Sequence, residues 1–182
     1  MSIVILNGIE DQNIISDTLV DMIKERGGAS VSFNLGNMEI LPCRSCGACS
    51  IKSPGRCVVR DDAHEILKAI ARADTLIMLT PIRFGGYSSC LKKMVDKFML
   101  LGLPLYTVKH GHLLHPNRYG SKHIIGIGVY DGKERHREKS FKRLVKNNAL
   151  NLQCTHEAFV LKPSEDNQEL KRQIIDIIRE VC

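Results

Sequence analysis

Four cysteines in one short stretch of the chain have the spacing of a metal-binding motif. Cys43, Cys46, Cys49 and Cys57 form a C-x2-C-x2-C-x7-C pattern. Three thiolates this close in sequence can occupy three corners of a cubane iron–sulfur cluster, and a fourth ligand follows further along the chain. Basic residues interspersed among them favour the thiolate form and offset the negative charge of a cluster. The spacing therefore indicates a 4Fe-4S cluster as a candidate cofactor.

Two other interpretations of these cysteines remain open. Structural zinc sites usually take two C-x2-C pairs separated by a dozen or more residues, so the spacing is less typical of zinc. The four thiols could also be reduced and bind no metal, because short motifs match by chance. The other three cysteines, Cys90, Cys154 and Cys182, have no evident partner, and the first two are expected to be small buried side chains.

A second stretch, residues 81–88, has the composition of a loop that binds a planar ring. Its proline fixes the backbone, its two aromatic rings can pack on or beside a ligand, and its Gly-Gly pair lets backbone N–H groups approach closely. The alternative is that Gly-Gly-Tyr forms only the turn between a strand and a helix. The candidate binding residues are Pro81, Ile82, Arg83, Phe84, Gly85, Gly86 and Tyr87.

Short apolar blocks alternate with helical patterns along the whole chain. The blocks predict five strands at residues 2–6, 30–35, 75–80, 123–129 and 154–161. Apolar residues at spacings of three and four predict five helices that follow these strands. The second helix is expected to begin at Asp61 and Asp62, whose carboxylates suit the free N–H groups of a helix start. The third is expected to bury a stripe that includes Met94 and Met99.

This alternation predicts a parallel sheet covered by helices on both faces. Five strands and five helices fit the α/β flavodoxin-like fold, a doubly wound five-stranded parallel sheet in three αβα layers, which binds ligands at the carboxyl ends of its strands. The Rossmann fold is the competing arrangement, but the first turn lacks G-x-G-x-x-G. We expect a single domain over residues 1–182 with two long connections, residues 37–60 (the cysteine loop) and residues 102–122. Connections of this length are usually functional or interfacial.

Composition sets the broad class of the protein. The 182 residues and their 43% hydrophobic side chains suit one folded domain and exclude a disordered chain. The net charge of +6 is modest and its basic residues are mostly interleaved with acids, so we expect no nucleic-acid partner. No apolar run approaches the ~18 residues of a membrane span, and the start of the chain lacks a signal-peptide pattern. We therefore expect a cytoplasmic protein without a membrane partner, in which the cysteines stay reduced.

Several motifs between residue 3 and about residue 96 occur together in the order of a known family. They are Pro42-Cys43-x-x-Cys46-Gly47-x-Cys49, Pro54-Gly55-x-Cys57, Asp61-Asp62 and Thr80-Pro81-Ile82-Arg83-Phe84-Gly85-Gly86-Tyr87-Ser88. The chain resembles the NADPH-dependent FMN reductase family, and within it the iron–sulfur flavoproteins. The resemblance implies a flavodoxin-like fold, noncovalent FMN and a homodimer or homotetramer. It also implies a 4Fe-4S cluster on the four clustered cysteines, close to the flavin.

The resemblance further implies where the FMN phosphate would bind. Family members usually carry a Gly-Ser-Pro-Arg type loop that ends in Asn-Thr after the first strand, where hydroxyls, a cation and free N–H groups hold the phosphate. Here Gly8 matches, Asn13 is a further candidate or only a helix cap, and Ser16 stands for the Thr. The Arg is missing, and Glu10 and Asp11 bring negative charge to this loop.

Three further segments complete the candidates. Gly132 follows the fourth strand, where the family closes over the flavin. The motif H-x-H-x-x-H, formed by His110, His112 and His115, predicts a loop over the flavin pocket or at a subunit contact, with a metal site as the alternative. The basic residues between 133 and 146 predict a solvated helix face, with a contact to the 2′-phosphate of NADPH as the alternative.

These features together predict an FMN-dependent oxidoreductase. The expected enzyme is NAD(P)H-dependent and exchanges electrons with a small-molecule or protein donor and acceptor. The flavin carries the chemistry, so no side chain is expected to act as catalyst. Two alternatives remain: an FMN reductase without a cluster, whose cysteines are free or zinc-bound, and a non-catalytic binding or redox-sensing module that has lost its flavin.

Overall fold

A five-stranded parallel sheet forms the centre of the computed structural model, which describes residues 2–10, 14–109, 111–130, 132–163 and 166–181. The strands are β1 (Ser2–Asn7), β2 (Ala29–Asn34), β3 (Thr75–Pro81), β6 (His123–Val129) and β7 (Thr155–Leu161). Their order in the sheet is β2-β1-β3-β6-β7, and every neighbouring pair is parallel. This order confirms the predicted flavodoxin-like, doubly wound α/β fold.

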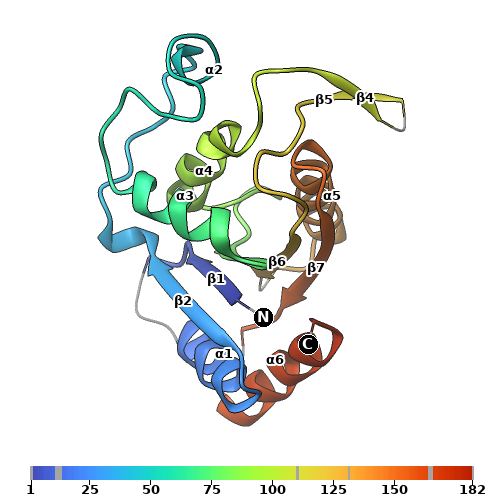
Figure 1. Cartoon of the computed structure of the whole chain (residues 1–182). Coiled ribbons are helices and arrows are strands. Elements are labelled where there is room, and N and C mark those ends of the chain that lie inside the picture. The colour runs from blue at the N-terminus through green and yellow to red at the C-terminus, as the bar shows by residue number, and fades with distance from the viewer. Residues whose placement is uncertain (1, 11–13, 110, 131, 164–165, 182) are drawn as a thin grey trace.

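Helices cover both faces of the sheet, which gives the three predicted layers (Figure 1). One face carries α1 (Ile14–Glu25) and α6 (Asn167–Val181), which pack against each other. The other face carries α3 (Ala63–Arg72), α4 (Ser89–Val95) and α5 (Arg135–Asn151). Within the described residues, no helix combines the length and the apolar character needed to cross a bilayer.

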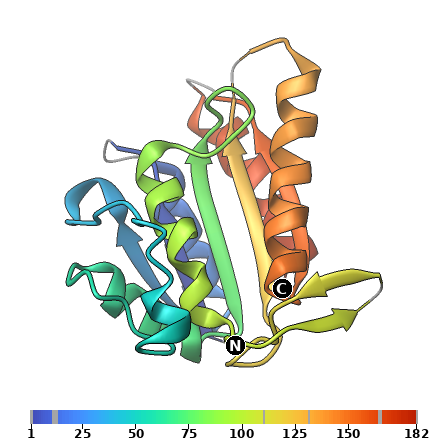
Figure 2. The ribbon, with the colours of Figure 1, turned by 90° about the horizontal axis from the view of Figure 1, so that it is seen from above.

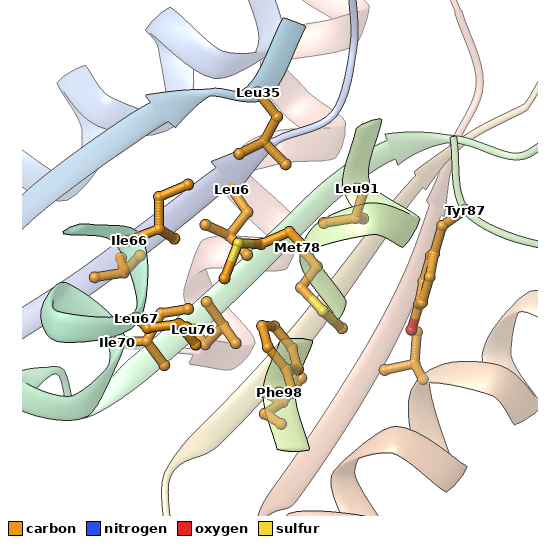
Figure 3. Packing of buried hydrophobic residues seen from close by; sticks show 14 of the residues in the cluster. Leu6, Leu35, Ile66, Leu67, Ile70, Leu76, Met78, Tyr87, Leu91 and Phe98 are labelled. Carbon is orange, nitrogen blue, oxygen red and sulfur yellow. The ribbon is translucent and has the colours of Figure 1, made fainter. Parts of the chain in front are cut away.

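Alternation along the strands divides the core into two clusters. In β1, Ile3 and Ile5 face α1 and α6, whereas Val4 and Leu6 face the α3–α4–α5 layer. This is the period of two that a strand buried on both faces requires. Figure 3 shows the cluster on the side of α3, α4 and α5, which we call the α3–α4–α5 cluster. In it, Leu6 and its neighbours on β3 meet apolar side chains of α3 and α4.

Two helices differ from their predicted form. α3 begins at Ala63 instead of Asp61, because the two aspartates hold the ends of the cysteine loop together. α4 ends at Val95 and continues as a 3₁₀ helix, η2 (Asp96–Leu101). The expectation of a buried stripe is therefore right for Met94 but wrong for Met99, which is 50% exposed.

The connection over residues 102–122 contains a hairpin that the sequence did not predict. Its strands are β4 (Thr107–Lys109) and β5 (His112–Leu114), paired antiparallel. The hairpin projects from the end of the molecule at which β6 begins, whereas the 81–88 loop lies at the opposite, carboxyl-terminal end of the strands (Figure 2). The hairpin therefore does not cover a flavin pocket at the carboxyl ends of its own chain. The other expectation for His112 and His115, a subunit contact, stays a prediction, and His110 lies outside the described residues.

Candidate active site

The loops that follow β1 and β3 are fastened to each other at the carboxyl edge of the sheet. The Gly8 backbone N–H donates to the Leu79 carbonyl at 2.8 Å, and the Ser88 hydroxyl donates to the Gly8 carbonyl at 2.7 Å. The Ser88 N–H in turn donates to the Thr80 hydroxyl at 2.9 Å. β1 and β3 lie on either side of the point where the strand order reverses, which is where doubly wound sheets bind ligands.

Only glycine fits at position 8, because the loop after β1 lies very close to the start of α4. A Cβ atom at Gly8 would lie 2.8 Å from both the Leu91 Cβ and the Ser88 hydroxyl oxygen. The adjoining Asn7 side chain is buried, and its carbonyl oxygen accepts from the Ile9 N–H at 3.0 Å. The start of the predicted phosphate loop is therefore held in one position.

The 81–88 loop ends in a tight turn with an exposed ring at its tip. Arg83 and Gly86 exchange backbone hydrogen bonds of 3.0 and 2.8 Å, and both central residues have positive φ, 52° at Phe84 and 81° at Gly85. Positive φ is costly for a bulky residue such as Phe. Phe84 is nevertheless 93% exposed, so burial against the described residues does not explain its place. A strained, exposed aromatic residue of this kind is typical of a ligand site.

Helix α5 packs closely beneath this turn. A Cβ atom at Gly85 would lie 2.9 Å from the Ser140 Cβ, so only glycine fits there. The Arg137 guanidinium carbon lies 6.0 Å from the centre of the Phe84 ring, within the range of a cation–π contact. Ile82 is buried, and its N–H donates to the Val129 carbonyl at 2.9 Å.

Tyr87 supports the loop from inside the protein. It is 7% exposed, its ring meets Phe141 edge-on at 6.0 Å, and its hydroxyl accepts a hydrogen bond from the Asn148 amide at 2.9 Å. Burial raises the pKa of Tyr87 to about 12. Of the two predicted aromatic contacts, the structure thus exposes Phe84 to a ligand and turns Tyr87 towards the core.

The loop after β6 packs upon itself. The Tyr130 hydroxyl donates to the Glu134 carboxylate, which also lies 3.2 Å from the Arg137 guanidinium. The hydrogen bond raises the pKa of Tyr130 and lowers that of Glu134. A Cβ atom at Gly132 would lie 2.2 Å from the Tyr130 hydroxyl oxygen, so Gly132 permits this arrangement.

The remaining candidates of the phosphate loop divide into described and undescribed residues. Ser16 is buried, with its hydroxyl 3.4 Å from that of Ser32. The Glu10 side chain lies at the start of α4, where its carboxylate is 3.9 Å from the Cys90 sulfur. Asp11 and Asn13 lie outside the described residues.

The cysteine loop is closed at its two ends by consecutive aspartates. Asp61 accepts from the backbone N–H of Leu41 at 2.8 Å, and it pairs with the Lys97 ammonium. Asp62 accepts from the Glu39 N–H at 2.8 Å, and its own N–H donates to the Glu39 carbonyl at 3.1 Å. The side chains of Asp61 and Lys97 are each only 2% exposed, so this ion pair is fully buried.

The four thiols lie beyond this closure. Cys43 and Cys46 are exposed, whereas Cys49 and Cys57 are half-buried against the α3–α4–α5 cluster. Cys49 lies within a single helical turn, α2 (Ala48–Ile51), which packs near η2. A hollow of about 1010 Å³ lies between the end of the loop, α3 and η2. In Figure 2 this loop stands apart from the tip of the 81–88 loop.

The sequence also matches a family model. Residues 1–132 match the model described as "NADPH-dependent FMN reductase". The chain belongs to this family. The family match includes the 81–88 loop, the phosphate loop and the cysteine loop, and it ends at Gly132.

Individual relatives support this family membership. An iron–sulfur flavoprotein of Methanosarcina thermophila is 30% identical over 116 residues, which cover 64% of this chain and 56% of that protein. The chain therefore spans about half the length of this relative.

Two solved structures share the fold. An NAD(P)H:quinone oxidoreductase from Methanothermobacter marburgensis superposes with a TM-score of 0.72 at 14% identity, over 98% of this chain and 93% of that one. An FMN-dependent NADH-azoreductase from Bacillus anthracis, solved in complex with FMN, gives a TM-score of 0.60 at 14% identity, over 99% and 96% of the two chains. At this level of identity the likeness establishes the fold alone.

The described residues fit a family flavin at the carboxyl edge. Phe84 offers an exposed ring at the tip of the turn, and Gly86 places no side chain beside it. The Glu10 carboxylate points to Cys90 at the start of α4. The sequence thus predicted the loop and its place at the carboxyl edge, but the strain at Phe84 and the contacts from α5 became visible only in the structure.

The cysteine loop fits an iron–sulfur cluster by the type and number of its thiols. Its arrangement does not: in the described part of the chain, no three His, Cys, Asp or Glu side chains gather into a metal site. The sequence also missed the closure of the loop by Asp61 and Lys97. Asp61 occurs in a motif of the family resemblance, but no pattern in the sequence links it to Lys97.

Proposed function

We propose that this chain is an FMN-dependent oxidoreductase that takes electrons from a reduced nicotinamide and passes them to an acceptor. The proposal rests on Phe84, whose backbone is strained and whose side chain is exposed. Its loop lies at the point between β1 and β3 where the strand order of the sheet reverses. When bound, FMN supplies hydride acceptance and single-electron transfer. We propose Cys43, Cys46, Cys49 and Cys57 as the ligands of a 4Fe-4S cluster.

The chain's own residues would bind and orient the cofactor. The Phe84 ring offers a face for stacking on the flavin, and the Gly85 backbone lies beside it at the tip of the turn. Gly8, whose own N–H is bonded to Leu79, would position the phosphate loop that follows it. Tyr87 and Asn148 fix the loop from beneath, so the binding surface is formed before the ligand arrives.

A spectrum of anaerobically purified protein tests the proposal. We expect bound flavin, iron and sulfide, and bleaching of the flavin absorbance on addition of NADPH or NADH. A colourless protein that takes up neither FMN nor iron and sulfide on reconstitution would contradict it. Titration with FMN separately tests the loss of flavin, because micromolar or tighter binding excludes a flavin-free sensing module.

A second candidate function is FMN reduction without a cluster. The observation that favours it is the exposure of Cys43 and Cys46 in a loop that gathers no metal ligands among the described residues. Replacement of Cys46 and Cys49 by serine distinguishes the two candidates. NADPH-driven flavin reduction and transfer to the acceptor would both survive in the second candidate, whereas transfer beyond the flavin would be lost in the first.

A homodimer or homotetramer, a cytoplasmic location and a small-molecule or protein electron partner remain part of this proposal. Sedimentation of the purified chain tests the assembly. Steady-state assays with NADH and NADPH as alternative donors identify the preferred nicotinamide.

A further inference from the structure

A second hollow lies further along α5 than the residues that contact the 81–88 loop, towards the carboxyl end of the helix. This groove, of about 740 Å³, lies between α5, β7 and the β4–β5 hairpin, and we refer to it as the α5–β7 groove. Lys142, Arg143 and Lys146 line it from α5, His156 and Glu157 from β7, and His112 from the hairpin. The proposed redox function uses none of these residues.

The groove has a strong positive charge. Helix α5 contains six Lys or Arg residues against one Glu, so it carries a net +5 of the chain's +6. Lys142, Arg143 and Lys146 form no ion pair with any carboxylate in the described part of the chain. Their charge is therefore available to an external anion, and the groove gives that charge a concave form that focuses it.

The groove also contains an acidic residue, Glu157 of β7. The Glu157 carboxylate has one oxygen that is buried and finds no hydrogen-bond partner among the described residues. Its other oxygen lies 4.0 Å from the His123 ring. A buried acceptor without a donor is unfavourable. The Glu157 side chain as a whole is 36% exposed, so a turn of its carboxylate towards the groove would let the N–H group of a ligand satisfy this oxygen. A phosphate chain has no such donor, whereas a polypeptide has one at nearly every residue.

β7 also offers a free edge to a polypeptide. It pairs with β6 on one side and with no other described strand on the opposite side. Its first residues, Thr155 and His156, are exposed. An exposed edge strand can accept an extended segment from another chain through backbone hydrogen bonds.

The groove is separate from the proposed flavin site. Ser140 and Arg137 contact the 81–88 loop, whereas the groove residues of α5 follow further along the helix. At 3.6 residues per turn, Lys142 and Lys146 lie about 160° and about 120° around the helix from Ser140, and Arg143 about 60°. The two lysines therefore do not share the helix face that contacts the loop.

We propose that the α5–β7 groove docks an acidic, extended segment of a protein partner. The segment adds to the free edge of β7, directs its carboxylates towards Lys142, Arg143 and Lys146, and supplies a backbone N–H to Glu157. The cations provide the charge complementarity, and the edge and the unpartnered carboxylate select a peptide over other polyanions.

Fluorescence anisotropy on the full chain without cofactors tests this proposal independently of the redox function. The probe is a labelled peptide of about eight residues that alternates Glu and Thr. We expect salt-sensitive binding that weakens by about tenfold or more when Lys142→Glu and Lys146→Glu are combined. The matched control is Lys171→Glu with Arg172→Glu on α6, which makes the same change in charge at exposed positions and should change binding by less than about twofold.

Three further probes decide the nature of the ligand. N-methylation of alternate peptide bonds should weaken binding in one of its two registers, because it removes the N–H groups that face β7. Equal binding in both registers, or equal loss in both charge variants, would overturn the proposal. Tighter binding of a single-stranded oligonucleotide of about eight nucleotides would also overturn it, as would a self-association that the Lys142/Lys146 variant abolishes.

Discussion

The 81–88 loop is hydrogen-bonded to neighbouring loops and strands on both sides of its tip, whereas the cysteine loop is hydrogen-bonded to the rest of the domain at its two ends. Gly8, the end of β6 and α5 all hold the first loop, and its one exposed ring is held in a strained turn. In the second loop, Asp61 and Asp62 close the stem and two of the four thiols beyond it are exposed.

The difference indicates two ways of building a binding site. A loop fixed in advance binds its ligand without further ordering, which favours affinity for a rigid ring such as a flavin. A loop that is closed at its stem but leaves Cys43 and Cys46 exposed can gather these ligands when a metal or cluster binds, so that binding and local folding are coupled. We therefore expect mutations to act differently on the two regions.

The largest expected effect concerns the closure of the cysteine loop. Lys97→Met leaves the buried Asp61 carboxylate without its cation, which should lower the free energy of unfolding by about 3–5 kcal/mol. Amide exchange in residues 39–62 should increase more than in the 81–88 loop. Chemical denaturation and hydrogen-exchange mass spectrometry measure the two effects.

The exposed pair formed by Lys92 and Asp96 is the matched control. Lys92→Met makes the same substitution shortly before Lys97 in the chain. It breaks a pair whose two side chains are 54% and 41% exposed. The expected loss is below about 1 kcal/mol. Equal losses in the two variants would mean that burial of the Lys97 pair contributes nothing to the closure.

The next largest effect concerns the packing of the carboxyl edge. Gly8→Ala places a methyl group 2.8 Å from Leu91 and Ser88, and overpacking of this kind costs about 1–3 kcal/mol. Gly86→Ala is the control for stability, since its added Cβ meets no atom closer than 3.5 Å. Denaturation curves that coincide for Gly8→Ala and the unmodified protein would show that the edge is less tightly held than the contacts indicate.

A smaller and oppositely signed effect is expected at the tip of the 81–88 loop. Phe84→Gly relieves the positive φ and should stabilise the fold by up to about 1 kcal/mol, while FMN affinity falls by about tenfold with the loss of the ring. Thermal denaturation and titration of FMN fluorescence measure the two quantities. Phe84→Tyr keeps the ring and should preserve affinity, so equal loss in both variants would contradict stacking on Phe84.

The smallest effect is a dependence on pH beneath the same loop. Burial raises the pKa of Tyr87 from 10.0 to about 12, so the fold favours the neutral phenol. The stability that this shift in pKa contributes to the fold is fully present below pH 10 and is lost as the pH rises towards 12. Tyr87→Phe should lose about 1 kcal/mol at neutral pH with the Asn148 hydrogen bond, but its stability should fall less steeply above pH 10. Parallel slopes in the two proteins would contradict the shift.

The fold could be predicted because its strands and most of its helices carry regular apolar patterns. The alternation of β1 and the stripe of α6 are local signals that agree with the global arrangement. The hairpin could not be predicted, since three-residue strands such as Thr107–Lys109 are too short to establish a period. The exposure of Met99 follows from the change of α4 to a 3₁₀ helix, which rotates the later side chains away from the stripe.

The position of the candidate loop was predictable, but its detail was not. The sequence predicted that the 81–88 loop follows a strand, which puts it at the edge of the sheet where doubly wound folds bind ligands. The inward turn of Tyr87 depends on Phe141 and Asn148, which lie more than fifty residues further along the chain. The path of the cysteine loop likewise depends on a distant residue, Lys97, so no local pattern could have described it.

The hairpin over residues 102–122 has a closed base, and this bears on how the chain tolerates changes in length. The Leu103 N–H donates to the Pro116 carbonyl at 2.8 Å, and the Arg118 N–H donates to the Leu101 carbonyl at 2.9 Å. The chain therefore leaves and re-enters the domain at nearly the same point. Because each doubling of loop length costs only about 0.6 kcal/mol, this position can accept an inserted module or a short replacement turn while both ends of the sheet keep their geometry.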